Sequence, residues 1–278
     1  MSTSLKGFGC LLSPVDLRDY RFSKISVLAE QYPSKYELPM DKTKVKNQRT
    51  VGSCVAHALS TILEYHDKYR EVLSTNFIYG IQYRLYLAKG PGMQLRNALK
   101  IAKNYGDMTE EHCQGNTEVE EVYDIASKAF NIKEYRENAL RYRINSYVKL
   151  NSVNDIKFAI MNYGPVLAGV KWYETTVFNN STKFITSTKM GGYSYHATVI
   201  YGWDENGWLC QNSWGKRWGD EGYYKLHFND GPREAYSIVD DENNDSVSDI
   251  VKPTHNIEVL SKVFKLINNI INKIVKRK

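Results

Sequence analysis

Cysteine is scarce in this chain, which has only four in 278 residues: Cys10, Cys54, Cys113 and Cys210. Their small number and wide spacing exclude the disulfide framework of a small secreted domain, so no structural disulfide is expected. Long apolar runs are missing too. No segment approaches the roughly 20 apolar residues that span a membrane, and residues 1–10 lack the apolar core of a signal peptide. These absences predict an intracellular, reducing location.

Charge of one sign is not in strong excess. The chain has 37 basic and 31 acidic residues, a formal net charge of +6, and no interleaving of basic and aromatic residues. Nucleic-acid binding is therefore not expected. Cys54 with His57, and His112 with Cys113, do not form a four-ligand pattern, so we expect no metal site and no cofactor. With 42% apolar side chains, the chain can build one large core or two lobes that share a cleft.

The run from Asn47 to Cys54 carries the strongest chemical signal. A loop ends just before Cys54, and the apolar spacing that follows predicts a helix from Cys54 to about Arg70. A cysteine in the first helical turn lies beside unpaired N–H groups and the positive end of the helix dipole, which favour the thiolate. A thiolate attacks carbonyl carbon when an imidazole holds its proton. The Gln48 amide would then donate to the oxygen of the tetrahedral intermediate.

Two later runs, residues 195–203 and 207–215, are typical of strands. Between them, Asn206-Gly207 is the signal of a tight hairpin turn, so the strands should pair antiparallel. That pairing would bring His196 and Asn212 to the same end of one sheet. An Asn side-chain carbonyl that accepts from the imidazole fixes the ring's tautomer and directs its other nitrogen at the sulfur. The pattern predicts His196 as the base and Asn212 as the residue that orients it.

Two neighbours of these residues need separate interpretation. His57 is a rival base, because it lies one helical turn after Cys54. A base on the same helix lacks a separate orienting residue, so core packing is the favoured role for His57. Trp214 follows Asn212 closely in the chain, and we expect it to shield the hydrogen bond between His196 and Asn212 from water.

Three blocks together resemble the signature blocks of the papain family of cysteine proteases, in that family's order. They are residues 48–54, His196-Ala197, and Asn212–Gly215 followed by Trp218–Tyr224. The similarity covers roughly residues 38–228. It implies an α+β, papain-like two-lobe fold, with a helical left lobe that carries Cys54 and an antiparallel β-barrel right lobe that carries His196 and Asn212. The active site would lie in the cleft between the lobes.

Other segments match the family in part. Pro91-Gly92-Met93 is similar to the family's double-glycine wall, and Gly92 and Trp214 are the residues expected to contact substrate. Val51 stands where secreted members have a disulfide cysteine, which also favours a reducing compartment. Residues 13–22 are similar to the leader of microbial and viral papain-like peptidases. In a viral chain, the expected location would be the host cell or the virion.

The composition predicts four parts: a leader (1–40), a papain-like peptidase domain (41–239), an acidic linker (240–255) and a basic amphipathic helical tail (256–278). Within the domain, helices are also expected near 74–87, 95–104, 118–130 and 154–163, and strands at 142–148 and 166–170. The helix near 118–130 is expected to be exposed on the surface.

The tail has a distinct pattern. From Ile257 onward, apolar residues recur at helical spacing beside six basic residues, with no acid after Glu258. Such a helix docks on its own domain, associates with a second copy, or binds an anionic membrane surface or a partner groove. The partners expected for the chain are therefore a protein or peptide substrate and one of these surfaces.

The residues and the resemblance together predict a cysteine protease. Cys54 is the expected nucleophile, His196 the base and then the acid, Asn212 the orienting residue and Gln48 the oxyanion donor. Two alternatives remain open. A catalytically silent papain-fold binding module would not react with a thiol-directed electrophile at Cys54. A papain-like transferase or deamidase would form the acyl-enzyme but pass it to an amine, or act on side-chain amides.

Deleting residues 250–278 should leave peptide cleavage intact, because the three signature blocks end before the acidic linker. The deletion should change the oligomeric state or the sedimentation with anionic vesicles, since the tail's apolar face needs a cover. Size-exclusion chromatography, vesicle sedimentation and a peptidase assay on both proteins make the test. Loss of peptidase activity would show instead that the tail belongs to the catalytic domain.

Overall fold

A computed structural model describes residues 7–16, 32–85, 87, 91–114 and 119–239. The predicted acidic linker and helical tail, residues 240–278, lie outside these ranges, as do leader residues 1–6 and 17–31. Within the ranges described, no helix is both long and apolar enough to cross a membrane.

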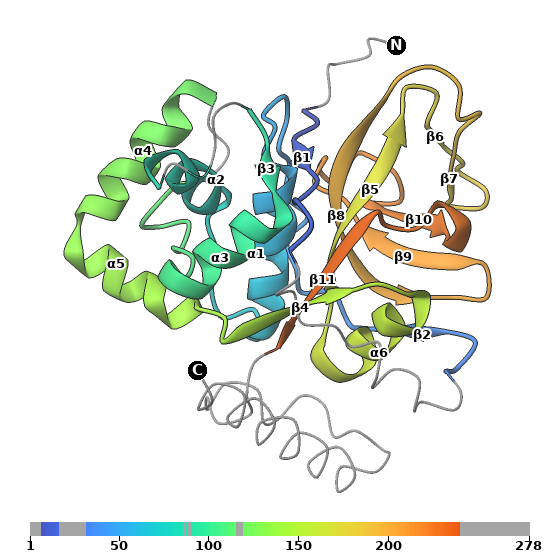
Figure 1. The fold of residues 1–278 in the computed structure, drawn as a ribbon, viewed down its shortest axis with the longest axis horizontal. Coiled ribbons are helices and arrows are strands. Elements are labelled where there is room, and N and C mark those ends of the chain that lie inside the picture. The colour runs from blue at the N-terminus through green and yellow to red at the C-terminus, as the bar shows by residue number, and fades with distance from the viewer. Residues whose placement is uncertain (1–6, 17–31, 86, 88–90, 115–118, 240–278) are drawn as a thin grey trace, which may run out of the picture. The chain divides into compact units, whose positions relative to one another are not determined.

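Most of the helices lie on one side of the structure, while the helix at Val153–Tyr163 packs against the sheet (Figure 1). In chain order they are α1 (Cys54–His66), α2 (Thr75–Arg84), α3 (Leu95–Tyr105), α4 (Val119–Asn131), α5 (Lys133–Ala139) and α6 (Val153–Tyr163). The predicted helix starts at Cys54 and near Ser74 are confirmed, and Ser74 caps α2 by accepting from two backbone N–H groups. Sequence periodicity missed α5. The expected surface exposure of α4 is only half right, because Val122, Ala126 and Ala129 on its inner face are buried.

The strands form mainly one antiparallel sheet. In chain order they are β1 (Cys10–Leu11), β2 (Tyr36–Glu37), β3 (Met93–Gln94), β4 (Ser146–Leu150), β5 (Val166–Tyr173), β6 (Val177–Phe178), β7 (Ile185–Thr186), β8 (Tyr193–Trp203), β9 (Gly207–Gln211), β10 (Tyr223–His227) and β11 (Glu234–Val239). The order in the large sheet is β10-β9-β8-β5-β11-β4, with β2 on β8. The α+β architecture is confirmed. Among the strands described, β10 and β4 at the two ends of this order do not pair, so the strand order shows no closed barrel.

The predicted hairpin is formed by β8 and β9, which pair antiparallel from Val199 with Gln211 to Trp203 with Trp208. The turn differs in detail from a two-residue Asn-Gly turn. The Asp204 carboxylate accepts from the backbone N–H groups of Asn206 and Gly207, at 2.8 and 3.0 Å. An aspartate that bonds its own downstream backbone closes the turn.

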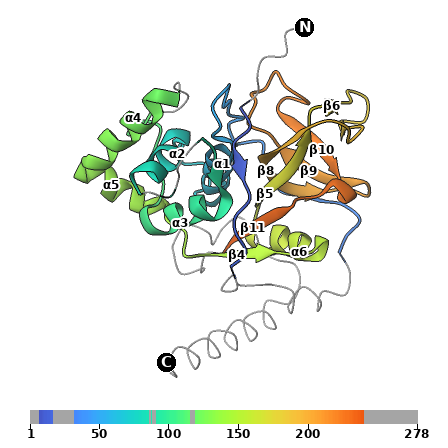
Figure 2. The same ribbon diagram turned by 45° about the horizontal axis from the view of Figure 1, so that its top comes forward.

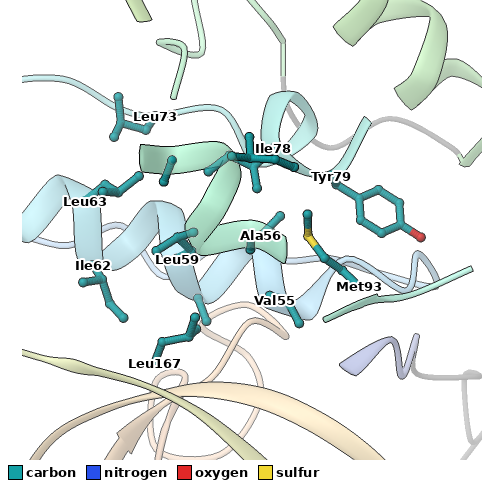
Figure 3. Packing of buried hydrophobic residues seen from close by; sticks show 14 of the residues in the cluster. Val55, Ala56, Leu59, Ile62, Leu63, Leu73, Ile78, Tyr79, Met93 and Leu167 are labelled. Carbon is teal, nitrogen blue, oxygen red and sulfur yellow. The ribbon is translucent and has the colours of Figure 1, made fainter. Parts of the chain in front are cut away.

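Helix α1 lies at the centre, between helices α2 to α5 and the sheet (Figures 1 and 2). Its side chains are buried from Cys54 to Glu64, the polar His57, Ser60 and Thr61 included, so the helix has partners around its whole circumference. Figure 3 shows Leu59 of α1 between Ile78 of α2 and Leu167 of β5, within one cluster of buried residues. This packing fixes the first residue of α1 against the sheet.

A buried ion pair holds the loop that leads to Gln48. The Lys46 ammonium lies 2.7 Å from the Glu64 carboxylate of α1, and both side chains are at most 5% exposed. The backbone of Leu73 is hydrogen-bonded to both members of this pair: its carbonyl accepts from Lys46, and its N–H donates to Glu64. Nearby, burial raises the pKa of Asp107 to about 7, and hydrogen bonding by Ser60 and the charge of Lys46 oppose that rise.

Replacing Lys46 by Met should destabilise the protein by about 3–5 kcal/mol, because it leaves the Glu64 carboxylate buried and uncompensated. Chemical denaturation of the two proteins measures the difference. The matched control is Lys44→Met, whose partner Glu110 lies 3.3 Å away while the lysine is 56% exposed. That change should cost less than about 1 kcal/mol. Equal losses for both variants would show that the buried pair has no special role.

Candidate active site

The structure brings the predicted base and its orienting residue together. His196 lies in β8 and Asn212 follows β9, and the His196 Nε2 is 2.7 Å from the Asn212 Oδ1. The same Oδ1 accepts from the backbone N–H of Ser213 at 2.8 Å, which identifies it as the oxygen of the amide. Because an oxygen can only accept, the Nε2 of His196 donates. In the neutral ring, Nδ1 then carries the lone pair.

Cys54 is the first residue of α1, as predicted, and its side chain is fully buried. Burial raises the pKa of the Cys54 thiol to about 11, although hydrogen bonds from the backbone of Ala197, Gly9 and Val55 act in the opposite direction. The contact with Ala197 places the sulfur beside the residue that follows His196. The expected preference for the thiolate is therefore outweighed here, because the sulfur is shut off from water.

Aromatic rings cover the His196–Asn212 hydrogen bond. The Trp214 ring centroid lies 4.6 Å from that of His196, and Trp214 is 8% exposed, as expected for a shield. Trp172 of β5 lies edge-on to His196 at 5.4 Å. Sequence reasoning missed Trp172, because it ended the predicted strand at Val170. At the outer end of β5 buried and half-buried residues alternate, so a strand extended by two residues would have included Trp172.

The Gln48 amide is held on both sides. Its Oε1 accepts from the Ser213 hydroxyl at 2.5 Å, and its Nε2 donates to the Val51 carbonyl at 2.9 Å. Nε2 also donates to the backbone carbonyl of Gly7. Ser213 was not singled out from the sequence, although it belongs to the Asn212–Gly215 block. A predicted oxyanion donor is thus oriented by its neighbours and hydrogen-bonded to a peptide carbonyl oxygen.

The Gly7 carbonyl belongs to a segment that runs through the site, residues 7–14, which we term the cleft segment. Strand β1 of this segment lies between α1 and the sheet in two views (Figures 1 and 2) and pairs parallel with β3, Cys10 opposite Met93. The Met93 N–H donates to the Gly9 carbonyl at 2.7 Å. The Phe8 ring lies 6.0 Å from the ring of His196. The segment therefore contacts both the helical side and the sheet side of the site.

Glycines allow this close approach. A Cβ atom at Gly9 would overlap the Gly52 carbonyl, and one at Gly7 would overlap the Val51 carbonyl. The predicted wall residue Gly92 has a φ of 93°, and a Cβ there would lie 2.8 Å from the Gly9 oxygen. Gly92 thus lies against the cleft segment, and the hydrogen bond to this segment comes from the next residue, Met93.

The cleft segment is not aligned for cleavage. The peptide group that touches the Cys54 sulfur does so through the Gly9 backbone. The carbonyl held by Gln48 belongs to Gly7, two residues earlier. In acyl transfer, one peptide group must offer its carbon to the nucleophile and its oxygen to the oxyanion donor. The segment divides these two contacts between different peptide groups.

The rival base His57 and the candidate metal ligands are the remaining sequence candidates. The His57 Nδ1 lies 3.0 Å from the Ser53 carbonyl and 3.2 Å from its hydroxyl, so the rival base is bonded to the start of its own helix. All four cysteines are free thiols. In the part of the chain that the structure describes, no group of three or more His, Cys, Asp or Glu side chains is placed to hold a metal ion.

Comparison with known proteins shows which family the chain resembles. The family model described as papain family cysteine protease matches residues 33–241. The uncharacterized peptidase C1-like protein L477 of Acanthamoeba polyphaga mimivirus is 26% identical over 220 residues, or 71% of this chain and 66% of that protein. Cathepsin B-like protease 1 of Arabidopsis thaliana is 37% identical over 92 residues, or 31% of this chain and 22% of that protein. The chain thus spans slightly under two thirds of the first relative and about a fifth of the second.

Solved structures show the same fold. Xylellain, a cysteine protease from Xylella fastidiosa, superimposes with a TM-score of 0.70 at 21% identity, over 87% of this chain and 98% of that one. The cysteine protease and lectin-like domains of Cwp84 from Clostridium difficile give a TM-score of 0.60 at 20% identity, over 85% of this chain and 56% of that one. At these identities the likeness concerns the fold.

Replacing Gly9 by Val should displace the cleft segment from the site, because the valine side chain would overlap the Gly52 carbonyl. Alkylation needs the thiolate, so a covered thiol with a pKa of about 11 should react slowly at neutral pH and faster as the pH rises. When water reaches the sulfur, the pKa of Cys54 should fall. The alkylation rate at neutral pH should then rise about tenfold for each pKa unit of this decrease.

Iodoacetamide labelling, with Cys54 followed by peptide mass spectrometry over a pH series, measures this change. The control is Val15→Ser, at a leader position that is 83% exposed, and its labelling rate should match that of the unsubstituted chain. If Gly9→Val labels at the unsubstituted rate, the segment does not limit access to Cys54.

Proposed function

The chain belongs to the papain family of cysteine proteases, and from that premise we propose that it hydrolyses peptide bonds in proteins through Cys54, His196, Asn212 and Gln48. The observation that carries the proposal is the hydrogen bond between His196 and Asn212, beneath Trp214, with the Cys54 sulfur against the backbone of Ala197, the residue after His196. This is the arrangement that a thiol nucleophile and its base require.

The first step in this mechanism is formation of an ion pair. The Nδ1 atom of His196 takes the proton of the Cys54 thiol, while Nε2 stays bonded to Asn212. The amide oxygen of Asn212 prevents the ring from turning and favours the tautomer in which Nδ1 is the base. The two tryptophans exclude water from this bond, which strengthens it.

The thiolate then attacks the substrate carbonyl carbon. The carbonyl oxygen becomes an oxyanion and accepts from the Gln48 Nε2 and the Cys54 backbone N–H, a stabilisation of about 3 kcal/mol for each well-placed donor. The Ser213 hydroxyl fixes the Gln48 amide in this orientation before substrate arrives. The Gly7 carbonyl, which now accepts from the same Nε2, stands in for the substrate oxygen.

Collapse of the intermediate breaks the C–N bond. The imidazolium of His196 protonates the leaving amine, and the acyl group remains on the Cys54 sulfur. A water molecule then gives a proton to His196 and attacks the thioester carbon. The carboxylic acid leaves, and the thiol is restored as the sulfur recovers its proton.

The cleft segment must move before any substrate can bind. It occupies the Gln48 amide, the N–H of Met93 and the space beside the Cys54 sulfur at the same time. We therefore propose that the chain with this segment in place is the inactive state. A silent binding module is disfavoured, because the chain holds Cys54, His196, Asn212 and Gln48 and the structure joins His196 to Asn212 by a hydrogen bond. No observation favours a transferase or deamidase.

In the Gly9→Val chain, replacing Cys54 or His196 by Ala should abolish peptide hydrolysis, with at least roughly a thousandfold loss in kcat, while Asn212→Ala should keep weak activity. The double Cys54→Ala, His196→Ala variant should be no worse than either single change, because the two residues act as one unit. A fluorogenic peptide assay gives the rates, and mass spectrometry of the products separates hydrolysis from acyl transfer. The control Cys113→Ala removes a buried thiol outside the site and should keep full turnover. Substantial cleavage by the Cys54→Ala protein would contradict the proposal.

A further inference from the structure

A cavity of about 760 Å³ lies between the loop that follows β2 and the turn that leads into β10. None of the four proposed catalytic residues lines it, and the mechanism above does not use it. Tyr201 of β8 and Tyr223 of β10 both line the cavity, with their ring centroids 5.7 Å apart. The Leu38 N–H donates to the Tyr201 carbonyl at 3.0 Å, which holds the loop against β8.

The walls of this cavity are acidic. The carboxylate side chains that line it are Glu37, Asp41, Asp220 and Glu221. Lys216 also lines it, so four negative charges against one positive charge leave these walls at −3, in a chain whose net charge is +6. The Lys183 ammonium lies 2.8 Å from the Asp220 carboxylate, and both side chains are largely exposed. Within the described residues, the other three carboxylates have no hydrogen-bond or ion-pair partner.

Tyr201 brings an unused hydroxyl to the same cavity. Its side chain is only 7% exposed, and its hydroxyl has no hydrogen-bond partner in the part of the chain that the structure describes. Burial raises the pKa of Tyr201, and the charges of Glu37, Cys210, Tyr223 and Asp220 add to the rise. The hydroxyl therefore keeps its proton at neutral pH and can donate or accept a hydrogen bond when a ligand enters.

Hydrogen bonds hold the walls in place before a ligand arrives. Asp220 and Tyr223 exchange two backbone hydrogen bonds, each of 2.9 Å, which close the turn that carries the acidic side chains. On the opposite wall, the Met40 carbonyl accepts from the Thr43 N–H at 3.1 Å and from the Tyr223 hydroxyl at 3.2 Å. A preformed site costs less free energy to occupy than one that must first become ordered.

We propose that this cavity is a second binding site, separate from the catalytic residues, and that it takes a basic peptide segment. A Lys or Arg side chain would donate charge-assisted hydrogen bonds to the carboxylates, and the Tyr201 hydroxyl oxygen would accept another. Tyrosine rings attract a cation placed over their faces. The long aliphatic stem of such a side chain can pack on Leu38 and Met40, which also line the cavity.

Two other ligand classes fit the cavity less well. An acidic segment would meet like charge. For a bare metal ion, no group of three or more His, Cys, Asp or Glu side chains is suitably placed within the described ranges. The inference goes beyond the proposed function and does not depend on peptide hydrolysis.

Fluorescence anisotropy of a labelled oligolysine peptide, titrated with the full chain at about 0.15 M salt, tests the proposal. The chain should bind oligolysine and not oligoglutamate of the same length, although its net charge of +6 would favour the opposite. The double variant Glu37→Gln, Asp41→Asn should bind oligolysine roughly fivefold or more weakly, since both changes keep the shape and remove the charge. Tyr201→Phe should also weaken binding.

The matched control is the double variant Glu134→Gln, Glu205→Gln. It removes the same charge from two exposed carboxylates that do not line the cavity, and its affinity should stay within about twofold. Equal losses in the two double variants would show that only the overall charge matters and would overturn the inference. Unchanged affinity in the Glu37, Asp41 variant would overturn it as well.

Carbodiimide cross-linking locates the bound peptide by a second measurement, which needs no variant. The reagent joins a lysine of oligolysine to a carboxylate in contact with it, and mass spectrometry of the digest identifies the residue. We expect the cross-links at Glu37, Asp41 and Glu221. Cross-links spread evenly over exposed carboxylates, Glu134 and Glu205 included, or confined to the catalytic cleft, would contradict a site in this cavity.

Discussion

The docking of α1 on β8 is the contact on which the rest of the structure depends. It joins the helical side to the sheet and sets the Cys54 sulfur against the backbone of Ala197, next to His196. The contact is rigid because α1 is buried on nearly all sides and has no solvent face along which to slide. A nucleophile and its base come from segments more than 140 residues apart, and the packing of one helix sets their relation.

The same packing places two opposing effects on the Cys54 thiol, and the cleft segment determines which of them is larger. The start of α1 favours a thiolate, whereas complete burial raises the pKa of Cys54 to about 11. Only removal of the segment can change the balance, since the helix and β8 do not move apart without loss of the core. Gly7 and Gly9 let the segment come within backbone contact of the site, so its cover excludes water as well as substrate. The cleft segment thus accounts both for the raised pKa of Cys54 and for the blocked access to the site.

The sequence predicted the parts of the site that lie within local patterns. Cys54 has a loop before it and a helical period after it, and His196 and Asn212 flank a hairpin turn, so each could be placed by spacing alone. The β1–β3 pairing and the bond from Ser13 to Glu234 could not, because they join residues 83 and 221 positions apart with no periodic signal. Closure of the sheet was expected from resemblance, and the strand order does not show it. Helix α5 and the outer end of β5 were missed because the predicted helix before α5 ended at residue 130 and the predicted strand ended at residue 170.

In the proposed mechanism, the backbone edge at Gly92 and Met93 binds the cleft segment in the inactive state and the substrate in the active state. A strand edge offers N–H and C=O groups to a chain running in either direction, so it does not by itself distinguish a cleft segment from a substrate. Direction decides the chemistry, because it determines which peptide group faces the sulfur. Glu234 holds the backbone of the segment at Ser13 rather than a side chain, so this contact does not depend on which side chain stands at that position.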